Sequence, residues 1–203
     1  MVTYLITGFE PFTTGQGLKL THNPTGEMAR RIANQLDDAH SAILPVAYRE
    51  TRPALEDLFD SLKPTIWMGL GYAPHRLKVD LETVALNLEH AASFDNAGES
   101  PTMRPIIDDA PLAYRSRIQE SSAVETLVRF GLDAQIATHA GTFLCNQSFF
   151  LGCHFAESSD FLELGSFVHV PPLESFDTLE TALAEVLKNE KQRLADGDAK
   201  LRV

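Results

Sequence analysis

The chain has 203 residues, of which 44% are hydrophobic and 22% charged, values typical of a single globular domain of ordinary size. Its formal net charge of -11 argues against nucleic acid and anionic membranes as partners, because both select for basic patches. No apolar run approaches the length of a membrane span, and residues 1–7 lack the basic start of a signal peptide.

The first seventy residues alternate between the periodicities of strands and helices. In chain order, the pattern predicts a strand over 3–7, a helix from Pro24, a strand over 42–47, a helix ending before Pro64 and a strand over 66–70. Asn23 is the expected N-cap of the first helix, because proline is favoured at the first helical position that follows. Strands and helices therefore alternate along this part of the chain.

The middle of the chain is less regular, with extended chain over 78–88 and a long loop over 94–111. The alternation then resumes. The remaining expected elements are a helix closed by Gly131, a strand over 134–138, a helix over 145–157, a strand over 166–170 and a last helix. We expect Asp177 with Glu180 to cap the last helix, and residues 193–203 to form a frayed polar tail.

This order of elements predicts one α/β domain over residues 1–203. Its sheet should be open, twisted and mostly parallel, with helices on both faces. Ligands of such sheets bind beyond the carboxyl ends of the strands. The loop after Thr7, the turn before Cys145 and His169 all follow predicted strands, so we expect them at one edge of the sheet.

Cys145 follows a glycine-containing turn at the start of a predicted helix. Free N–H groups and the helix dipole at such a position favour the thiolate, lower the pKa of the thiol and can hold an oxyanion. These features make Cys145 a candidate nucleophile. The alternative is a small buried hydrophobic residue, which is what most free cysteines are.

A cysteine nucleophile needs a base from a different element of the fold. His169 stands at the end of a β-branched run that Pro171 stops, which predicts an exposed histidine at a strand end. An ordinary strand-end histidine is the alternative. The two candidates support each other, because each supplies the partner that the other requires.

The two cysteines, Cys145 and Cys153, lie eight residues apart on one predicted helix, roughly 12 Å at 1.5 Å per residue. This separation is too large for a disulfide, so we expect a cytoplasmic protein with Cys153 as a buried thiol. His139 and His154 complete no recognised zinc spacing with the cysteines. We therefore expect no metal and no cofactor.

Six segments match, in order and with comparable spacing, the motifs of one known family. They are T-G-F-E-P-F at 7–12, N-P-T at 23–25, an E-R-x-A-x-N-like segment at 82–87, P-x-A-Y at 111–114, A-G-x-x-x-C-N at 140–146 and F-x-H-V-P at 167–171. Through these segments the chain resembles pyroglutamyl peptidase I, also called pyrrolidone carboxyl peptidase, over about residues 3–172.

The resemblance implies a cysteine exopeptidase that removes an N-terminal pyroglutamyl residue through a thioester acyl-enzyme. It assigns Cys145 as the nucleophile, His169 as general base and then acid, and Glu82 as the carboxylate that orients the imidazole. Without the resemblance, Glu82 would be interpreted as a solvated strand residue.

The same resemblance implies a substrate pocket with aromatic walls. Phe9 and Phe12 match positions that face the pyrrolidone ring, and Phe143 and Leu144 are expected to bind substrate beside the cysteine. The implied partners are N-terminally pyroglutamylated peptides, and the implied assembly is a homo-oligomer, a tetramer in the resembled family.

Several positions depart from the family pattern. Thr13-Thr14 replaces a glycine pair, the loop to Asn23 is longer, and two residues are added between Gly69 and Glu82. An arginine near the cysteine is replaced by Ala92.

The candidates to replace that arginine are Arg76 and Arg115, although either would ordinarily be a solvated surface charge. Two other functions stay open: a related cysteine amidase with altered acyl specificity, and a catalytically impaired homologue that binds a small molecule or peptide.

Overall fold

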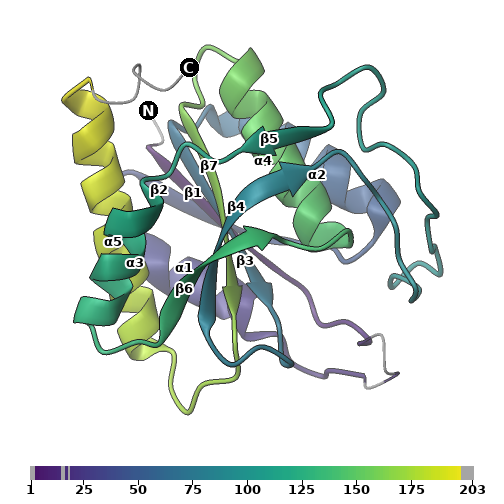
Figure 1. Ribbon diagram of the computed structural model, residues 1–203, viewed down its shortest axis with the longest axis horizontal. Helices are drawn as coiled ribbons and strands as arrows, with labels where there is room; N and C mark the ends of the chain where they lie inside the picture. Colours follow the sequence, from purple (N-terminus) through teal and green to yellow (C-terminus); the bar gives the residue numbers. More distant parts are fainter. Residues whose placement is uncertain (1–2, 15–16, 18, 198–203) are drawn as a thin grey trace.

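A seven-stranded sheet lies at the centre of the computed structural model, which describes residues 3–14, 17 and 19–197 (Figure 1). Its strands are β1 (Tyr4–Phe9), β2 (Ala39–Leu44), β3 (Ile66–Tyr72), β4 (Val79–Leu86), β5 (Ala113–Arg115), β6 (Ala134–His139) and β7 (Leu164–Val170). The order is β2-β1-β3-β7-β4-β5, and β6 also pairs with β4. Most pairings are parallel, whereas β4 runs antiparallel to both β5 and β7.

Helices cover both faces of the sheet (Figure 1). They are α1 (Pro24–Ala33), α2 (Tyr48–Leu62), α3 (Glu120–Arg129), α4 (Leu144–Ser158) and α5 (Asp177–Ala195). One apolar core joins the sheet to α1, α3 and α5, and a second joins it to α2 and α4. Alternation along β1 serves both cores, since Tyr4 and Ile6 face the first and Leu5 faces the second. The predicted α/β class is confirmed.

The N-terminus of α1 is built as the sequence predicts and holds the end of β1. Asn23 caps the helix, and its Oδ1 accepts hydrogen bonds from the backbone N–H and the hydroxyl of Thr25 at 3.1 and 2.8 Å. The Thr25 hydroxyl oxygen in turn accepts from the backbone N–H of Phe9 at 3.0 Å. A methyl group at Gly8 would lie only 2.2 Å from the Thr25 backbone, so glycine permits this close approach.

Both predicted ends of the second strand were wrong. The second strand is Ala39–Leu44 rather than 42–47, because it is an edge strand whose polar residues His40 and Ser41 break the apolar pattern. Beyond it, the chain turns into α2, and the backbone N–H of Val46 donates to Glu10 Oε1 at 2.9 Å.

The beginning and end of α5 also differ from the prediction. Asp177 is the first helical residue and not the cap, and its carboxylate pairs with Arg31 of α1 at 3.2 Å. The chain is not frayed at residue 193 as predicted, since the helix continues to Ala195 and Arg193 pairs with Glu190 at 2.6 Å. The rest of that predicted tail, residues 198–203, lies outside the described residues.

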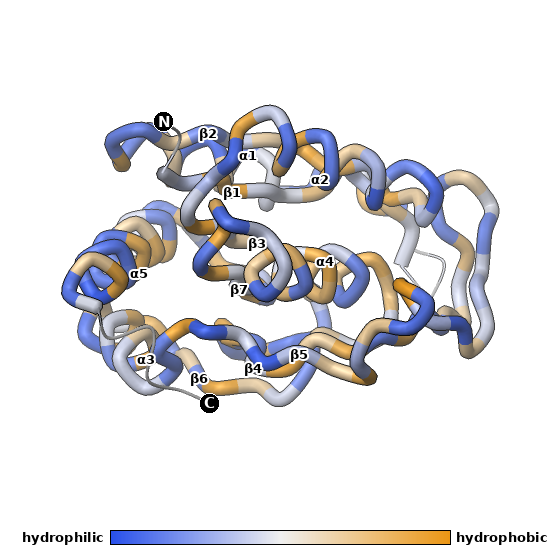
Figure 2. The backbone as a smooth tube through the Cα atoms, turned by 90° about the horizontal axis from the view of Figure 1, so that it is seen from above, coloured by the Kyte–Doolittle hydropathy of each residue, from blue (hydrophilic) through white to orange (hydrophobic). Residues whose placement is uncertain are grey.

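The long segment between β4 and β5 extends beyond the sheet on the α2 and α4 side (Figure 1). It is closed by an isolated bridge between Glu89 and Arg104, and we call residues 87–112 the excursion. Helix α4 is buried over most of its length and is largely hydrophobic, whereas α5 presents hydrophilic residues outward (Figure 2). Among the described helices, none is both long and apolar enough to cross a bilayer.

Candidate active site

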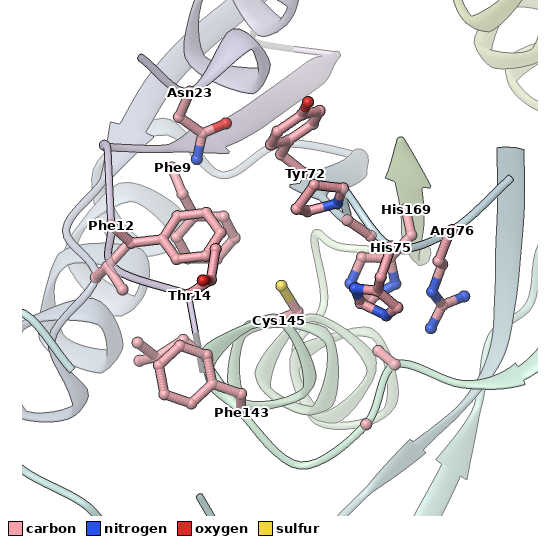
Figure 3. A pocket seen from close by; sticks show the side chains of 16 residues that line it. Phe9, Phe12, Thr14, Asn23, Tyr72, His75, Arg76, Phe143, Cys145 and His169 are labelled. Atoms are coloured by element: carbon pink, nitrogen blue, oxygen red, sulfur yellow. The ribbon is translucent and has the colours of Figure 1, made fainter. Parts of the chain in front are cut away.

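A pocket at one edge of the sheet brings the predicted site residues together (Figure 3). Cys145 lies between an aromatic side, with Phe9, Phe12 and Phe143, and a polar side, with His169 (Figure 3). Among the residues that the structure describes, the lining consists of Phe9, Phe12, Thr14, Asn23, Val46, Tyr72, Ala73, Pro74, His75, Arg76, Ala140, Gly141, Phe143, Leu144, Cys145 and His169.

Cys145 reaches this edge by a different route from the one predicted. Phe9 and His169 lie at the carboxyl ends of the parallel strands β1 and β7, as expected. Strand β6, however, runs parallel to β4 and therefore opposite to β7. The turn over residues 140–143 leads the chain back, so that α4 begins beside the end of β3, where the Cys145 sulfur lies over Gly71.

Gly71 sets the proximity of the cysteine and the histidine. A methyl group at this position would lie 2.8 Å from Cys145 Sγ and 3.0 Å from His169 Cδ2. Both side chains therefore pack against the same Cα atom, in space that only glycine leaves open. No sequence pattern singled out Gly71, because its role depends on a contact between three separate elements.

Glu82 lies behind the histidine and contacts its distal ring nitrogen. Nδ1 of His169 donates to Oε1 of Glu82 at 2.7 Å. The antiparallel register, with Asp80 opposite His169 and Glu82 opposite Phe167, makes the two residues diagonal neighbours. This hydrogen bond places the proton on Nδ1 and leaves Nε2 as the acceptor.

The surroundings of these residues differ from those that the residue pattern alone predicts. His169 is 6% exposed rather than an open strand-end residue, and Glu82 is fully buried rather than solvated. A charged carboxylate is rarely buried without a partner, so its pairing with the imidazole is itself a sign of function.

Burial dominates the acid–base properties of Cys145 and His169. It raises the pKa of Cys145 to about 12, with the charge of Glu82 acting in the same direction and Arg76 opposing it. The lowered pKa expected from the helix N-terminus is therefore not found, because desolvation outweighs the helix effect. Burial also lowers the pKa of His169. Both shifts favour the uncharged forms of the two groups, the thiol and the neutral imidazole.

The aromatic wall is fixed by contacts behind it. The ring of Phe143 meets Tyr48 edge to face, with centroids 5.6 Å apart, and the Tyr48 hydroxyl donates to the Thr142 carbonyl at 3.5 Å. Phe9 is buried and Phe12 is half-buried. Leu144, also predicted to bind substrate, lines the pocket as a buried residue.

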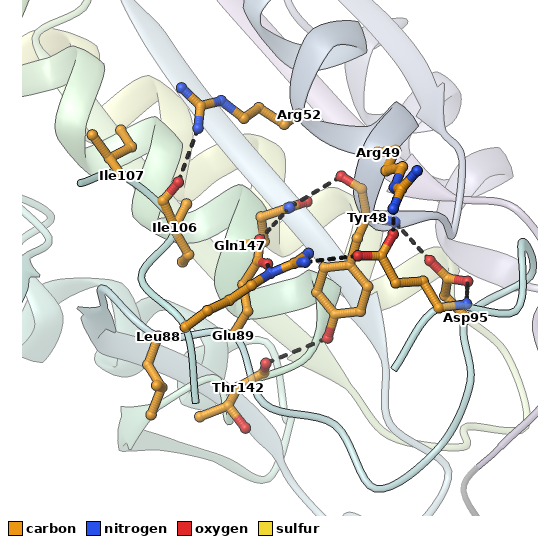
Figure 4. A network of polar contacts seen from close by, with 12 residues as sticks. Tyr48, Arg49, Arg52, Leu88, Glu89, Asp95, Ile106, Ile107, Thr142 and Gln147 are labelled. Atoms are coloured by element: carbon orange, nitrogen blue, oxygen red, sulfur yellow. Dashed lines mark hydrogen bonds and ion pairs between the residues drawn. The ribbon is translucent and has the colours of Figure 1, made fainter. Parts of the chain in front are cut away.

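The excursion is joined to this wall by a polar network (Figure 4). Glu89 is buried and forms an ion pair with Arg104 at 2.6 Å, and it accepts from Gln147 Nε2 at 2.6 Å. His90 and Thr142 exchange two hydrogen bonds, from His90 N to the Thr142 carbonyl and from the Thr142 hydroxyl to the His90 carbonyl. The excursion thereby holds the turn that precedes Cys145.

Asn146 anchors the start of α4. It is fully buried, its Oδ1 accepts from the Leu86 backbone N–H, and its Nδ2 donates to the Leu86 and Leu88 carbonyls at 2.8 and 3.0 Å. A polar residue next to the candidate nucleophile was the available sequence signal for this role. Without the anchor, the helix that carries Cys145 would lose its fixed place beside β4.

The two candidate arginines have different surroundings. Arg76 lines the pocket, and its Nη1 lies 2.8 Å from Oε1 of Glu82. Arg115 pairs instead with Glu120 of α3 at 2.8 Å and is absent from the pocket lining, as is the exposed Ala92. Within the described part of the chain, no cluster of three or more His, Cys, Asp or Glu residues is arranged to hold a metal ion.

Comparisons with known proteins identify the family. The family model described as pyroglutamyl peptidase matches residues 2–186. The pyrrolidone-carboxylate peptidase of Pyrococcus furiosus is 33% identical over 170 residues, 82% of this chain and 79% of that relative. The enzyme of that name from Bacillus thuringiensis is 30% identical over 174 residues, 84% of this chain and 79% of the relative.

Solved structures of the same group also match. Pyrrolidone carboxyl peptidase from Thermococcus litoralis has a TM-score of 0.89 and 28% identity, covering 100% of this chain and 99% of that one. A Pyrococcus furiosus pyrrolidone carboxyl peptidase has a TM-score of 0.86 and 26% identity, covering 95% and 99%. The chain therefore belongs to the pyroglutamyl peptidase family.

Proposed function

We propose that this chain hydrolyses the amide bond that follows an N-terminal pyroglutamyl residue, through a thioester acyl-enzyme. The observation that supports this most strongly is the convergence of Cys145 and His169 over Gly71, with Glu82 on the distal nitrogen of the imidazole. Family membership and the names of the relatives indicate the acyl group.

The pocket suits the pyrrolidone ring chemically. Phe9, Phe12 and Phe143 present aromatic surface, and Leu144 adds an aliphatic contact. Such walls favour a flat, neutral lactam over a charged glutamate, whose desolvation they would not compensate. The ring is therefore expected between the phenylalanines, with its exocyclic carbonyl over Cys145.

In the acylation step, Nε2 of His169 takes the thiol proton as Cys145 Sγ bonds to the carbonyl carbon. The carbonyl oxygen becomes an oxyanion near the backbone N–H groups of Leu144 and Cys145, which lie in the first turn of α4. Collapse of this intermediate breaks the C–N bond, and the imidazolium gives its proton to the leaving amine. The shortened peptide departs and the thioester remains.

In the deacylation step, His169 takes a proton from water as the water oxygen attacks the thioester carbon. The C–S bond then breaks, pyroglutamate leaves, and the proton returns to the sulfur of Cys145. Glu82 stabilises the imidazolium in both steps. Each proton that His169 accepts is therefore returned within the cycle.

We further propose that the protein works in the cytoplasm as a homo-oligomer, on peptides and not on nucleic acid or membranes. Two free cysteines support a reducing compartment. Exposed apolar side chains support association, among them Ile136, Val128 and Phe130. Light scattering of the purified protein would test the assembly, with a monomer mass contradicting it.

The function is tested by release of a fluorophore from a pyroglutamyl amide under reducing conditions. We expect Cys145→Ser to lower kcat by roughly a thousandfold or more, because the alcohol is a far weaker nucleophile than the thiol. Cys153→Ala is the matched control, since Cys153 is a buried thiol of the same helix outside the pocket lining. It should retain turnover.

Prolyl and N-acetyl amides serve as acyl controls. Turnover of the pyroglutamyl amide alone supports the proposed specificity. Equal or faster turnover of another amide would indicate the related amidase, and binding without turnover by folded, reduced protein would indicate the impaired homologue. Either result contradicts the proposed function.

A further inference from the structure

Arg76 places a cation beside the candidate triad. It belongs to the loop between β3 and β4, and it lies on the same side of the pocket as His169 (Figure 3). Its side chain is 21% exposed. The Nη1 atom lies 2.8 Å from Oε1 of Glu82, the oxygen that also accepts the hydrogen bond from His169.

The same guanidinium nitrogen also contacts Asp80, two residues before Glu82 on β4. Both carboxylates are buried, and Gln135 Nε2 donates to the other oxygen of Asp80 at 2.7 Å. Two buried carboxylates on one side of a strand repel each other and require a counter-charge. Arg76 supplies it, and at the same time it fixes the oxygen of Glu82 that His169 contacts.

The charge of Arg76 acts on both reacting groups. His169 faces Glu82 and Asp80 from β4 and Arg76 from the preceding loop, and the arginine disfavours the imidazolium. Cys145 faces Glu82 and Arg76, and here the arginine favours the thiolate. Removing this positive charge therefore raises the pKa of both groups.

We propose that Arg76 is a positioning residue of the catalytic site, which orients Glu82 toward His169 and sets the pH range in which the Cys145–His169 pair works. This inference rests on the proposed function. It distinguishes Arg76 from Arg115, whose partner Glu120 lies on α3 and outside the pocket lining.

The test compares Arg76→Gln, Arg76→Lys and the matched control Arg115→Gln in pyroglutamyl amide hydrolysis across the pH range where histidine and cysteine titrate. For Arg76→Gln we expect kcat to fall roughly tenfold to a hundredfold and KM to stay nearly unchanged. A fall of this size is a part of the rate enhancement that general acid–base catalysis contributes. Both limbs of the pH profile of Arg76→Gln should move to higher pH. Arg76→Lys keeps the charge and should keep the limbs in place, and Arg115→Gln should match the wild type.

A wild-type kcat and pH profile in Arg76→Gln would overturn the proposal, as would displaced limbs in Arg76→Lys. If Arg76→Gln fails to fold, the pH profile of Arg76→Lys still tests the proposal. Alkylation of Cys145 by iodoacetamide gives a readout that needs no substrate, and its pH profile should move upward in Arg76→Gln. If the wild type hydrolyses no pyroglutamyl amide, the alkylation profile still tests Arg76, so the two failures are distinguishable.

Discussion

Gly71 is the residue on which the geometry of the cysteine and histidine most directly depends. In Gly71→Ala the new methyl would lie within 3.0 Å of Cys145 Sγ, His169 Cδ2 and Phe167 Cε1. All three are side-chain atoms that can shift, so the fold should persist while the reacting atoms separate. We expect kcat to fall roughly a hundredfold, as for a misplacement of about 1 Å.

The measurement is kcat together with the melting temperature. Gly26→Ala is the matched control, because its methyl would meet the side chain of Ile43 at 2.9 Å, outside the pocket lining. It should leave kcat unchanged. A normal kcat in Gly71→Ala would show that the two side chains do not depend on this space.

The pH dependence of the wild type follows from the buried imidazole. As the proposed general base, His169 acts only when it is unprotonated, and burial lowers its pKa from the ordinary value of 6.5. A lowered pKa keeps the ring neutral to a lower pH, so the acid limb of kcat/KM should lie below pH 6.5. A rate profile with the pyroglutamyl amide checks this, and an acid limb above that pH would contradict it.

At the scale of elements, periodicity predicted most helices and strands because one apolar face of each packs on the sheet. It misplaced β2, an edge strand with a mixed pattern, and it could not reveal that β6 runs opposite to β7. Strand direction depends on partners far away in sequence, which no local pattern encodes.

The position of α4 over the sheet depends on two glycines that belong to no motif of the sequence. A methyl at Gly165 of β7 would lie 2.6 Å from the Gly152 backbone, and one at Gly152 would lie 2.2 Å from the Trp67 ring. This close contact holds α4 along β7 and so brings Cys145 to the end of β3. The cysteine was predictable from its motif, but its location was not.

The three residues of the proposed triad were predictable to different degrees. Cys145 and His169 stand in local patterns that suggest chemistry, a turn before a helix and the end of a strand. Glu82 was found only through the family resemblance, because a carboxylate within a strand suggests solvent exposure when its neighbours are unknown. Its burial, like the contacts of Arg76, appears only when β4 and β7 are paired.

At the scale of the whole molecule, contacts of the excursion support the aromatic wall of the pocket, although the two are distant in sequence. Arg104 pairs with the buried Glu89 and with Glu99, and its guanidinium lies 5.8 Å from the ring centroid of Tyr48. Tyr48 in turn packs against Phe143. Loss of Arg104 should therefore loosen the wall without touching the atoms that react.

We expect Arg104→Gln to raise KM for the pyroglutamyl amide roughly fivefold, equivalent to about 1 kcal/mol, with kcat nearly unchanged. Arg49→Gln is the matched control, because Arg49 also pairs with Glu99 but is largely exposed and contacts neither Glu89 nor Tyr48 through its guanidinium among the described residues. Steady-state kinetics of both variants separate the two parameters. A fall in kcat with KM unchanged would mean that the excursion acts on the Cys145–His169 pair. Wild-type values would mean that the aromatic wall keeps its structure without Arg104.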